Sequence, residues 1–80
     1  MDDIDDIFYP IIYFCRAGVS DKDWIIKMMR FIPEDKRVEI SNEYMTIFCG
    51  TPDLPIRRKE ANTYLHSQAK KYREMNNGKQ

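Results

Sequence analysis

An 80-residue chain is long enough for one domain at most, so we expect a single domain over residues 1–80. One Trp, five Tyr, four Phe and five Met favour a packed core over disorder. The 13 basic and 13 acidic residues give a net charge of zero, which argues against strong non-specific binding to nucleic acid.

The first predicted helix covers residues 5–17, and the four Asp residues among the first six suit the positive end of a helix dipole. Its apolar residues recur at helical spacing, and Gly18 is a typical residue after a helix end. Pro10 conflicts with this prediction because it lacks the backbone N–H that a helix interior needs. The helix therefore begins near position 9, or it begins earlier and bends at Pro10. The apolar residues are Ile4, Ile7, Phe8, Ile11, Ile12, Phe14 and Cys15.

The second predicted helix covers residues 20–32. Ser20 is the expected N-cap and Asp23 its reciprocal partner, while Val19 and Trp24 have the spacing of a hydrophobic staple. Pro33 ends the helix because a residue before proline is pushed out of the helical region. The predicted inner face consists of Trp24, Ile25, Met28, Met29 and Ile32.

Residues 33–49 are open to two interpretations. As a helix, Pro33 stands in the first turn and Gly50 closes the end. As a β-hairpin over 37–49, which would make the fold α+β, two strands would meet across Asn42-Glu43. An Asn-Glu pair is a poor two-residue turn because both of its positions would need positive φ angles. We therefore favour the helix.

The last and longest predicted helix covers residues 54–76, with Asp53 as its N-cap and Pro55 in its first turn. At ~1.5 Å per residue it would be roughly 30 Å long and would overhang its neighbours. Residues 76–80 should be a frayed tail. The predicted inner face consists of Ala61, Tyr64, Leu65, Gln68, Ala69, Tyr72 and Met75.

Together these segments predict an all-α bundle of four helices at about 5–17, 20–32, 33–49 and 54–76. No apolar run approaches the ~20 residues that cross a bilayer, and the acidic first residues are unlike a signal peptide. We therefore expect a cytoplasmic protein without a membrane partner.

Residues with catalytic potential are few. His66 is the only histidine and falls on the polar side of the last helix, and with three Gly there is no phosphate-binding loop. The Asp cluster at the start lacks the pattern of a metal cage. Cys15 and Cys49 have no metal-ligand spacing, and we expect two reduced, buried thiols rather than a disulfide. The sequence thus predicts no enzymatic activity, no cofactor and no metal.

Two stretches, VEISNEYMTIFCG and RRKEANTYL, carry a resemblance. Their shared elements are the pair Glu43-Tyr44 and the run Arg-Arg-x-x-Ala-Asn-Thr-x-Leu from Arg57 to Leu65. In these elements residues 38–65 resemble short uncharacterised proteins encoded by temperate bacteriophages and prophages. The resemblance implies a cytosolic accessory protein in an infected or lysogenic bacterium, and it implies no activity.

The favoured function is a small protein-interaction module that binds and modulates another protein, with self-association into a homodimer as an alternative. After position 56 the chain has seven basic and two acidic residues, so the positively charged last helix is the expected binding surface. The partner-binding residues we expect are Arg58, Lys59, Asn62, His66, Lys70, Tyr72 and Arg73.

The second hypothesis is a DNA-binding regulator of helix-turn-helix type. The last two helices would form the motif, and the start of the final helix would read base edges. The connection between them is longer than usual, and the acidic first half offers few phosphate contacts. Its site residues would be Arg57, Arg58, Lys59, Asn62 and Thr63.

Overall fold

The computed structural model describes the backbone of residues 7–78 and the side chains of residues 7–75. Two short strands come first, and three helices of increasing length follow. The strands are β1 (Cys15–Arg16) and β2 (Val19–Ser20), and the helices are α1 (Lys22–Met29), α2 (Glu34–Gly50) and α3 (Leu54–Gly78).

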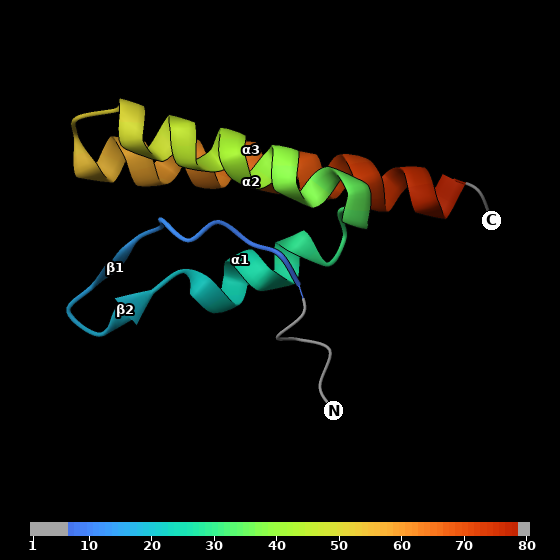
Figure 1. The fold of residues 1–80 in the computed structure, drawn as a ribbon, viewed down its shortest axis with the longest axis horizontal. Coiled ribbons are helices and arrows are strands. Elements are labelled where there is room, and N and C mark those ends of the chain that lie inside the picture. Colours follow the sequence, from blue (N-terminus) through green and yellow to red (C-terminus); the bar gives the residue numbers. More distant parts are fainter. Residues whose placement is uncertain (1–6, 79–80) are drawn as a thin grey trace.

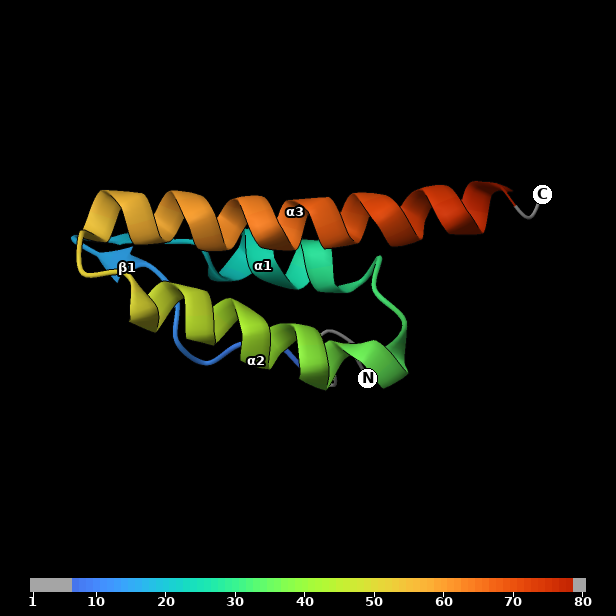
Figure 2. The same ribbon diagram turned by 90° about the horizontal axis from the view of Figure 1, so that it is seen from above.

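Helices α2 and α3 lie side by side and run in opposite directions, so they form a helical hairpin (Figures 1 and 2). Helix α1, the two strands and segment 7–14 form a second layer beneath this hairpin (Figure 1). In this layer α1 packs against α3. The described residues therefore form two layers, with the apolar side chains between them.

The predicted four-helix bundle is wrong, because residues 7–20 contain no helix. Pro10 is fully buried, and the irregular segment around it packs against the core instead of forming helical hydrogen bonds. Residues 1–6, which include the whole Asp cluster and the predicted start of this helix, lie outside the described residues. The side chains of this segment that pack on the core are Ile7, Tyr9, Tyr13 and Phe14.

Gly18 does not end a helix but completes a tight turn. Ala17 and Gly18 have φ angles of 53° and 81°, so both central residues of the two-residue loop are in the left-handed region. This geometry joins two antiparallel strands and pairs Cys15 with Ser20. The fold therefore does contain a hairpin, but at 15–20 and not at the 37–49 of the α+β alternative.

Helix α1 begins two residues later than predicted and ends three residues earlier, at Met29, and the expected capping box is absent. The Ser20 hydroxyl accepts a hydrogen bond of 3.1 Å from the N–H of Lys22, and Asp21 stands at the N-cap without a side-chain cap bond. At the other end, Arg37 Nε of α2 donates to the carbonyls of Met29 and Ile32 at 3.0 and 2.9 Å. An arginine from the next helix thus binds two carbonyls at and just after the end of α1, of which that of Met29 also accepts from the N–H of Ile32 at 3.1 Å.

Helix α2 confirms the helical interpretation of this segment, with Pro33 at the N-cap and Gly50 as the last residue. Thr51 Oγ1 donates to the carbonyl of Ile47 at 3.2 Å and helps to close the end. Three residues, 51–53, then connect α2 to α3. Such a short connection requires the two helices to be neighbours.

Asp53 caps α3 as predicted. Its Oδ1 accepts from the N–H of Ile56 at 3.3 Å, and its carbonyl accepts from the N–H of Arg57 at 2.8 Å. The buried positions Ala61, Leu65 and Ala69 then follow at four-residue steps along one face. Two alanines in this row let α2 and α1 approach the helix backbone closely.

One hydrophobic core joins the three helices. Leu65 of α3 and Tyr44 of α2 are both completely buried, as is Ile25 of α1. The Met residues of α1 are core residues, as predicted. The core members are Ile25, Met28, Met29, Ile32, Ile40, Tyr44, Phe48, Ala61, Leu65 and Ala69.

The last turns of α3 continue past the start of α2 (Figure 2). Tyr72 still packs partly on the core, but Met75 is 50% exposed. The backbone is helical to Gly78, so the predicted fraying does not reach residues 76–78, and residues 79 and 80 lie outside the described residues. Among the residues that the structure describes, no helix is both long and apolar enough to span a lipid bilayer.

Candidate functional site

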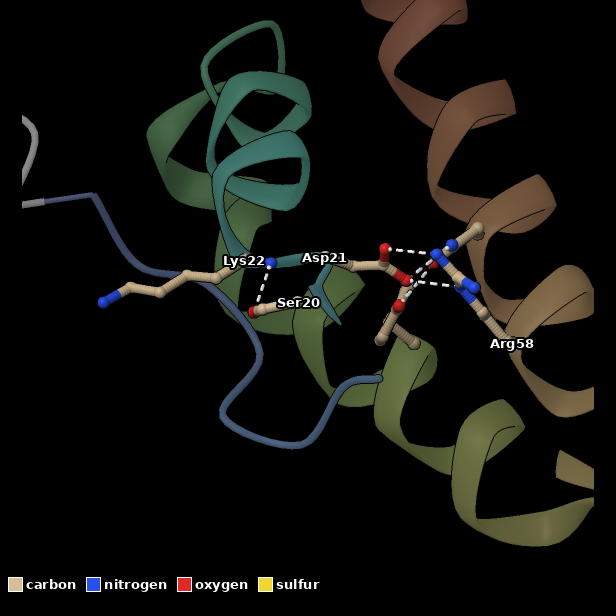
Figure 3. A network of polar contacts seen from close by, with 6 residues as sticks. Ser20, Asp21, Lys22 and Arg58 are labelled. Carbon is tan, nitrogen blue, oxygen red and sulfur yellow. Dashed lines mark hydrogen bonds and ion pairs between the residues drawn. The ribbon is translucent and has the colours of Figure 1, made fainter. Parts of the chain in front are cut away.

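The start of α1 and the first half of α3 are joined by an ion pair. Asp21 points from the start of α1 toward Arg58 on α3 (Figure 3). Arg58 Nε and Nη2 donate to the two carboxylate oxygens of Asp21 at 2.9 Å each. This two-point geometry fixes both groups more firmly than a single contact would. Asp21 can face α3 because its own side chain does not cap α1.

Asn62 extends this pair toward α2. Its Nδ2 donates to Asp21 at 3.1 Å, and its Oδ1 accepts the hydroxyl hydrogen bond of Tyr44. Arg58 also lies over the ring of Phe14, with 4.0 Å between the guanidinium carbon and the ring centre. The network thus connects segment 7–14, α1, α2 and α3 at one point.

The network perturbs two ionisable groups. Burial alone would raise the pKa of Asp21, but hydrogen bonds from Arg58 and Asn62 and the charge of Arg58 outweigh it, so the pKa is lower than usual. Burial, and then the nearby charge of Asp21, raise the pKa of Tyr44 well above its usual range. Neither group has the exposure or the substrate cleft of a catalytic acid or base, so we assign the network a structural role.

Arg57 also makes contacts within the molecule. Its Nη2 donates to the carbonyl of Pro52 at 2.9 Å, and its guanidinium carbon lies 5.5 Å from the centre of the Phe48 ring. This arginine therefore folds back over the connection between α2 and α3. It stabilises the turn of the helical hairpin through Nη2, while its buried Nε has no hydrogen-bond partner within the described residues.

Of the five residues predicted to read DNA, the structure places Arg57, Arg58 and Asn62 in internal contacts. Only Lys59 and Thr63 are exposed without such contacts. The relative orientation of the two helices also differs from that in a helix-turn-helix motif. Helices α2 and α3 are antiparallel (Figure 1), whereas the helices of a helix-turn-helix cross at roughly 90–120°. DNA binding stays a prediction, and the described geometry does not favour it.

The second half of α3 carries the other predicted binding residues. His66, Lys70 and Arg73 are exposed and stand on the side of α3 that faces α1. We call these three residues the basic rim. They surround a shallow depression of about 30 Å³ whose apolar floor is formed by Met28, Phe31 and Ala69.

The basic rim is not neutralised by its neighbours. Within residues 7–75 the one ion pair is that of Arg58 with Asp21, so His66, Lys70 and Arg73 have no acidic partner there. The guanidinium carbon of Arg73 lies 5.5 Å from the centre of the Phe31 ring. Arg73 is thus positioned by an aromatic ring while its hydrogen-bond donors stay available to a ligand.

The seven predicted partner-binding residues therefore separate into groups. Three form the basic rim, and Lys59 is exposed nearer the start of α3. Arg58 and Asn62 belong to the internal network, which no local sequence signal indicates. Tyr72 is half-buried, and the Lys71 ammonium lies 5.2 Å from the centre of its ring. The floor residues Met28 and Phe31 were missed as site residues because they come from α1 and the turn after it.

The geometry of the depression limits its ligands. A volume of about 30 Å³ is far below the ~300–1,000 Å³ of typical small-molecule sites. A second, open hollow of about 420 Å³ lies along one face of α1, beside Asp23, Ile26, Lys27 and Arg30. We find no group of three His, Cys, Asp or Glu side chains suited to a metal among the described residues.

Both cysteines differ from their prediction. Cys15 and Cys49 are free, as expected, but they are exposed and not buried. Cys15 is in β1, which projects from the core, and Cys49 is on the outer side of α2 near its end. Their apolar sequence neighbours suggested burial, but Phe14 and Phe48 occupy the inner positions beside them.

Comparisons of the chain with protein-family models, with curated proteins and with solved structures found no match. The resemblance to phage proteins stays a prediction.

Proposed function

We propose that this protein is a small non-enzymatic protein-interaction module that binds an acidic partner on the basic rim. The observation that carries the proposal is the combination of an apolar floor with unpaired basic residues around it. Protein interfaces have this arrangement, since an apolar centre excludes water and charged groups at the edge select the partner. Met, Phe and Arg are also residue types enriched at such interfaces.

The size of the depression agrees with one side chain of a partner better than with a free metabolite. An aromatic or aliphatic side chain would rest on Phe31 and Met28, while nearby carboxylates would approach Lys70 and Arg73. Each exposed ion pair would contribute roughly 0.2–1 kcal/mol, so the charges give selectivity more than affinity. The predicted phage resemblance would place the partner inside an infected or lysogenic bacterium.

A defined peptide tests the proposal. The probe is a fluorescently labelled synthetic peptide in which one Phe is flanked by Glu and Asp residues, and its binding is followed by fluorescence anisotropy. Reversing two rim charges with Lys70→Glu and Arg73→Glu should weaken binding about tenfold, or ~1.4 kcal/mol. The control Arg16→Glu changes an exposed charge in β1, at the other end of the molecule from the second half of α3 (Figure 1), and should leave binding unchanged.

Two results would overturn the proposal. Equal binding of a peptide with Lys in place of the acidic residues would remove the role of charge. Unchanged binding by the double variant would remove the role of the rim. A mixed-sequence DNA duplex serves as the second probe: salt-sensitive binding of the duplex that is lost in Lys59→Ala would instead favour the DNA-binding hypothesis.

A further inference from the structure

Acidic side chains of α2, opposite in charge to the basic rim, lie where α2 meets the other side of α3. Tyr64 of α3 is half-buried there, and burial, followed by the charges of Glu43 and Glu39, raises its pKa. Glu39 and Glu43 stand one helical turn apart on α2, next to the buried Ile40 and Tyr44, so both lie at the edge of the face that α2 packs against α3. They are exposed and have no ion pair within residues 7–75. We call Glu39, Glu43 and the neighbouring Tyr64 the acidic strip.

The basic rim and the acidic strip lie on opposite sides of α3. Tyr64 and His66 are two positions apart, and at ~100° per residue their side chains point roughly 200° apart around the helix axis. The buried row of Ala61, Leu65 and Ala69 lies between the two sides. The two charged surfaces of one molecule therefore cannot meet each other.

We propose that a second copy of this chain is a partner of the basic rim, and that the acidic strip of one copy docks on the basic rim of the next. This inference rests on the proposed function, because it assigns a partner to the same surface. The charges match, with Glu39 and Glu43 on one side and Lys70 and Arg73 on the other. The net charge of zero leaves no overall repulsion between copies.

This contact joins two different surfaces, so each pair of copies leaves one free basic rim and one free acidic strip. Such head-to-tail contacts either close into a ring or continue as a chain. The surfaces are small, since the rim spans little more than two turns of α3. Association should therefore be weak, sensitive to salt and not limited to a dimer.

Sedimentation velocity of the full chain tests the proposal. The average mass should rise above the 9.6 kDa of one chain as concentration increases at about 20 mM salt, where the Debye length is roughly 20 Å. It should fall back toward one chain at about 0.5 M salt, where that length is roughly 4 Å. A mass that stops at two copies would overturn the head-to-tail arrangement.

Charge reversal provides the sharper test. Variant one carries Lys70→Glu and Arg73→Glu, and variant two carries Glu39→Lys and Glu43→Lys. Each variant alone should remain monomeric, because its two docking surfaces carry the same charge: both are acidic in variant one and both are basic in variant two. Mixing the two should restore association, because the reversed rim of the first then meets the reversed strip of the second. Failure of the mixture to associate, with helical content intact by circular dichroism, would overturn the inference.

Mapping the contact surface by NMR distinguishes specific docking from general attraction between oppositely charged variants. In an NMR titration of isotope-labelled variant two with unlabelled variant one, shifts should be confined to its two docking surfaces, around residues 39–43 and 64–73. Shifts spread over all basic residues, Arg16 included, would contradict specific docking. A wild-type chain that stays monomeric yet still binds the acidic probe peptide at the rim would overturn self-association and leave the proposed function standing.

Discussion

Arg58 of α3 holds Asp21, the residue ahead of α1, through two hydrogen bonds of 2.9 Å each. The two residues are 37 positions apart in the sequence. The pair places α1 against α3, and α1 supplies Met28 to the floor of the depression. The internal network and the candidate binding surface are thus connected through the position of α1.

Replacing Asp21 with Asn should destabilise the protein and change its pH dependence. The folded pKa of Asp21 is below its ordinary value of 3.8, so the charged form stabilises the fold above that pH. This contribution is lost as the pH falls below about 4 and through the folded pKa. Thermal unfolding between neutral and acidic pH measures it.

Asp21→Asn should show a lower Tm at neutral pH and a smaller further loss on acidification than the wild type. The amide would also place a donor where Arg58 and Asn62 already donate. Asp35→Asn, at an exposed site in the first turn of α2, is the control. If both variants lose the same stability with acid, the network does not have the role assigned to it.

Tyr44→Phe should cost roughly 1–2 kcal/mol in the free energy of unfolding, because Asn62 Oδ1 loses its donor while the ring packing is retained. Urea denaturation gives this value. Tyr13→Phe is a matched control, since the Tyr13 hydroxyl makes no hydrogen bond within the described residues. A Tyr44→Phe variant as stable as the wild type would show that the hydroxyl contact contributes nothing.

A substitution in the tight turn at 17–18 should raise the stability of the protein, whereas the substitutions of Asp21 and Tyr44 should lower it. Ala17 has a φ of 53°, which is unfavourable for alanine, and Asn tolerates this region better. Ala17→Asn should therefore raise stability by about 0.5–1 kcal/mol, since Asn-Gly is a preferred pair for such a turn. Thermal unfolding measures the change.

Gly18→Ala is the companion variant and should lower stability. No atom lies within 4 Å of an added Cβ, so the loss would come from the φ of 81° alone. If residues 5–17 formed the originally expected helix, Ala17→Asn would be neutral or unfavourable. The two variants together thus distinguish the hairpin from the helix.

Both thiols should react with an aromatic disulfide reagent in the native protein. Cys15 and Cys49 are exposed, so modification needs no unfolding. The absorbance of the released thiolate should correspond to both cysteines without denaturant. A reaction that requires denaturant would restore the original expectation of buried thiols.

The helices were predictable where the sequence contains local end signals. Pro33 and Gly50 bound α2, and the Asp53 cap begins α3, because these residue types act through their immediate backbone neighbours. The prediction of a helix over segment 7–14 is wrong because apolar residues at helical spacing also occur in this irregular segment. The buried Pro10 and the loop at Ala17 decide against a helix.

The candidate site was only partly predictable for a related reason. Basic residues on α3 are visible in the sequence, but nothing local indicates which of them turn inward. Arg58 differs from Lys59 because Asp21 and Phe14, both far away in sequence, meet it in the fold. The same holds for the floor, since Phe31 joins Arg73 only after α1 docks on α3.

The central claim is that the basic rim and its apolar floor form the binding surface. NMR chemical-shift mapping of the isotope-labelled wild-type chain with the unlabelled acidic peptide tests it most directly. The account predicts shifts centred on His66, Lys70 and Arg73, and on Met28 and Phe31 across the depression. Shifts centred elsewhere, such as on the exposed Phe8 and Ile11, would contradict it.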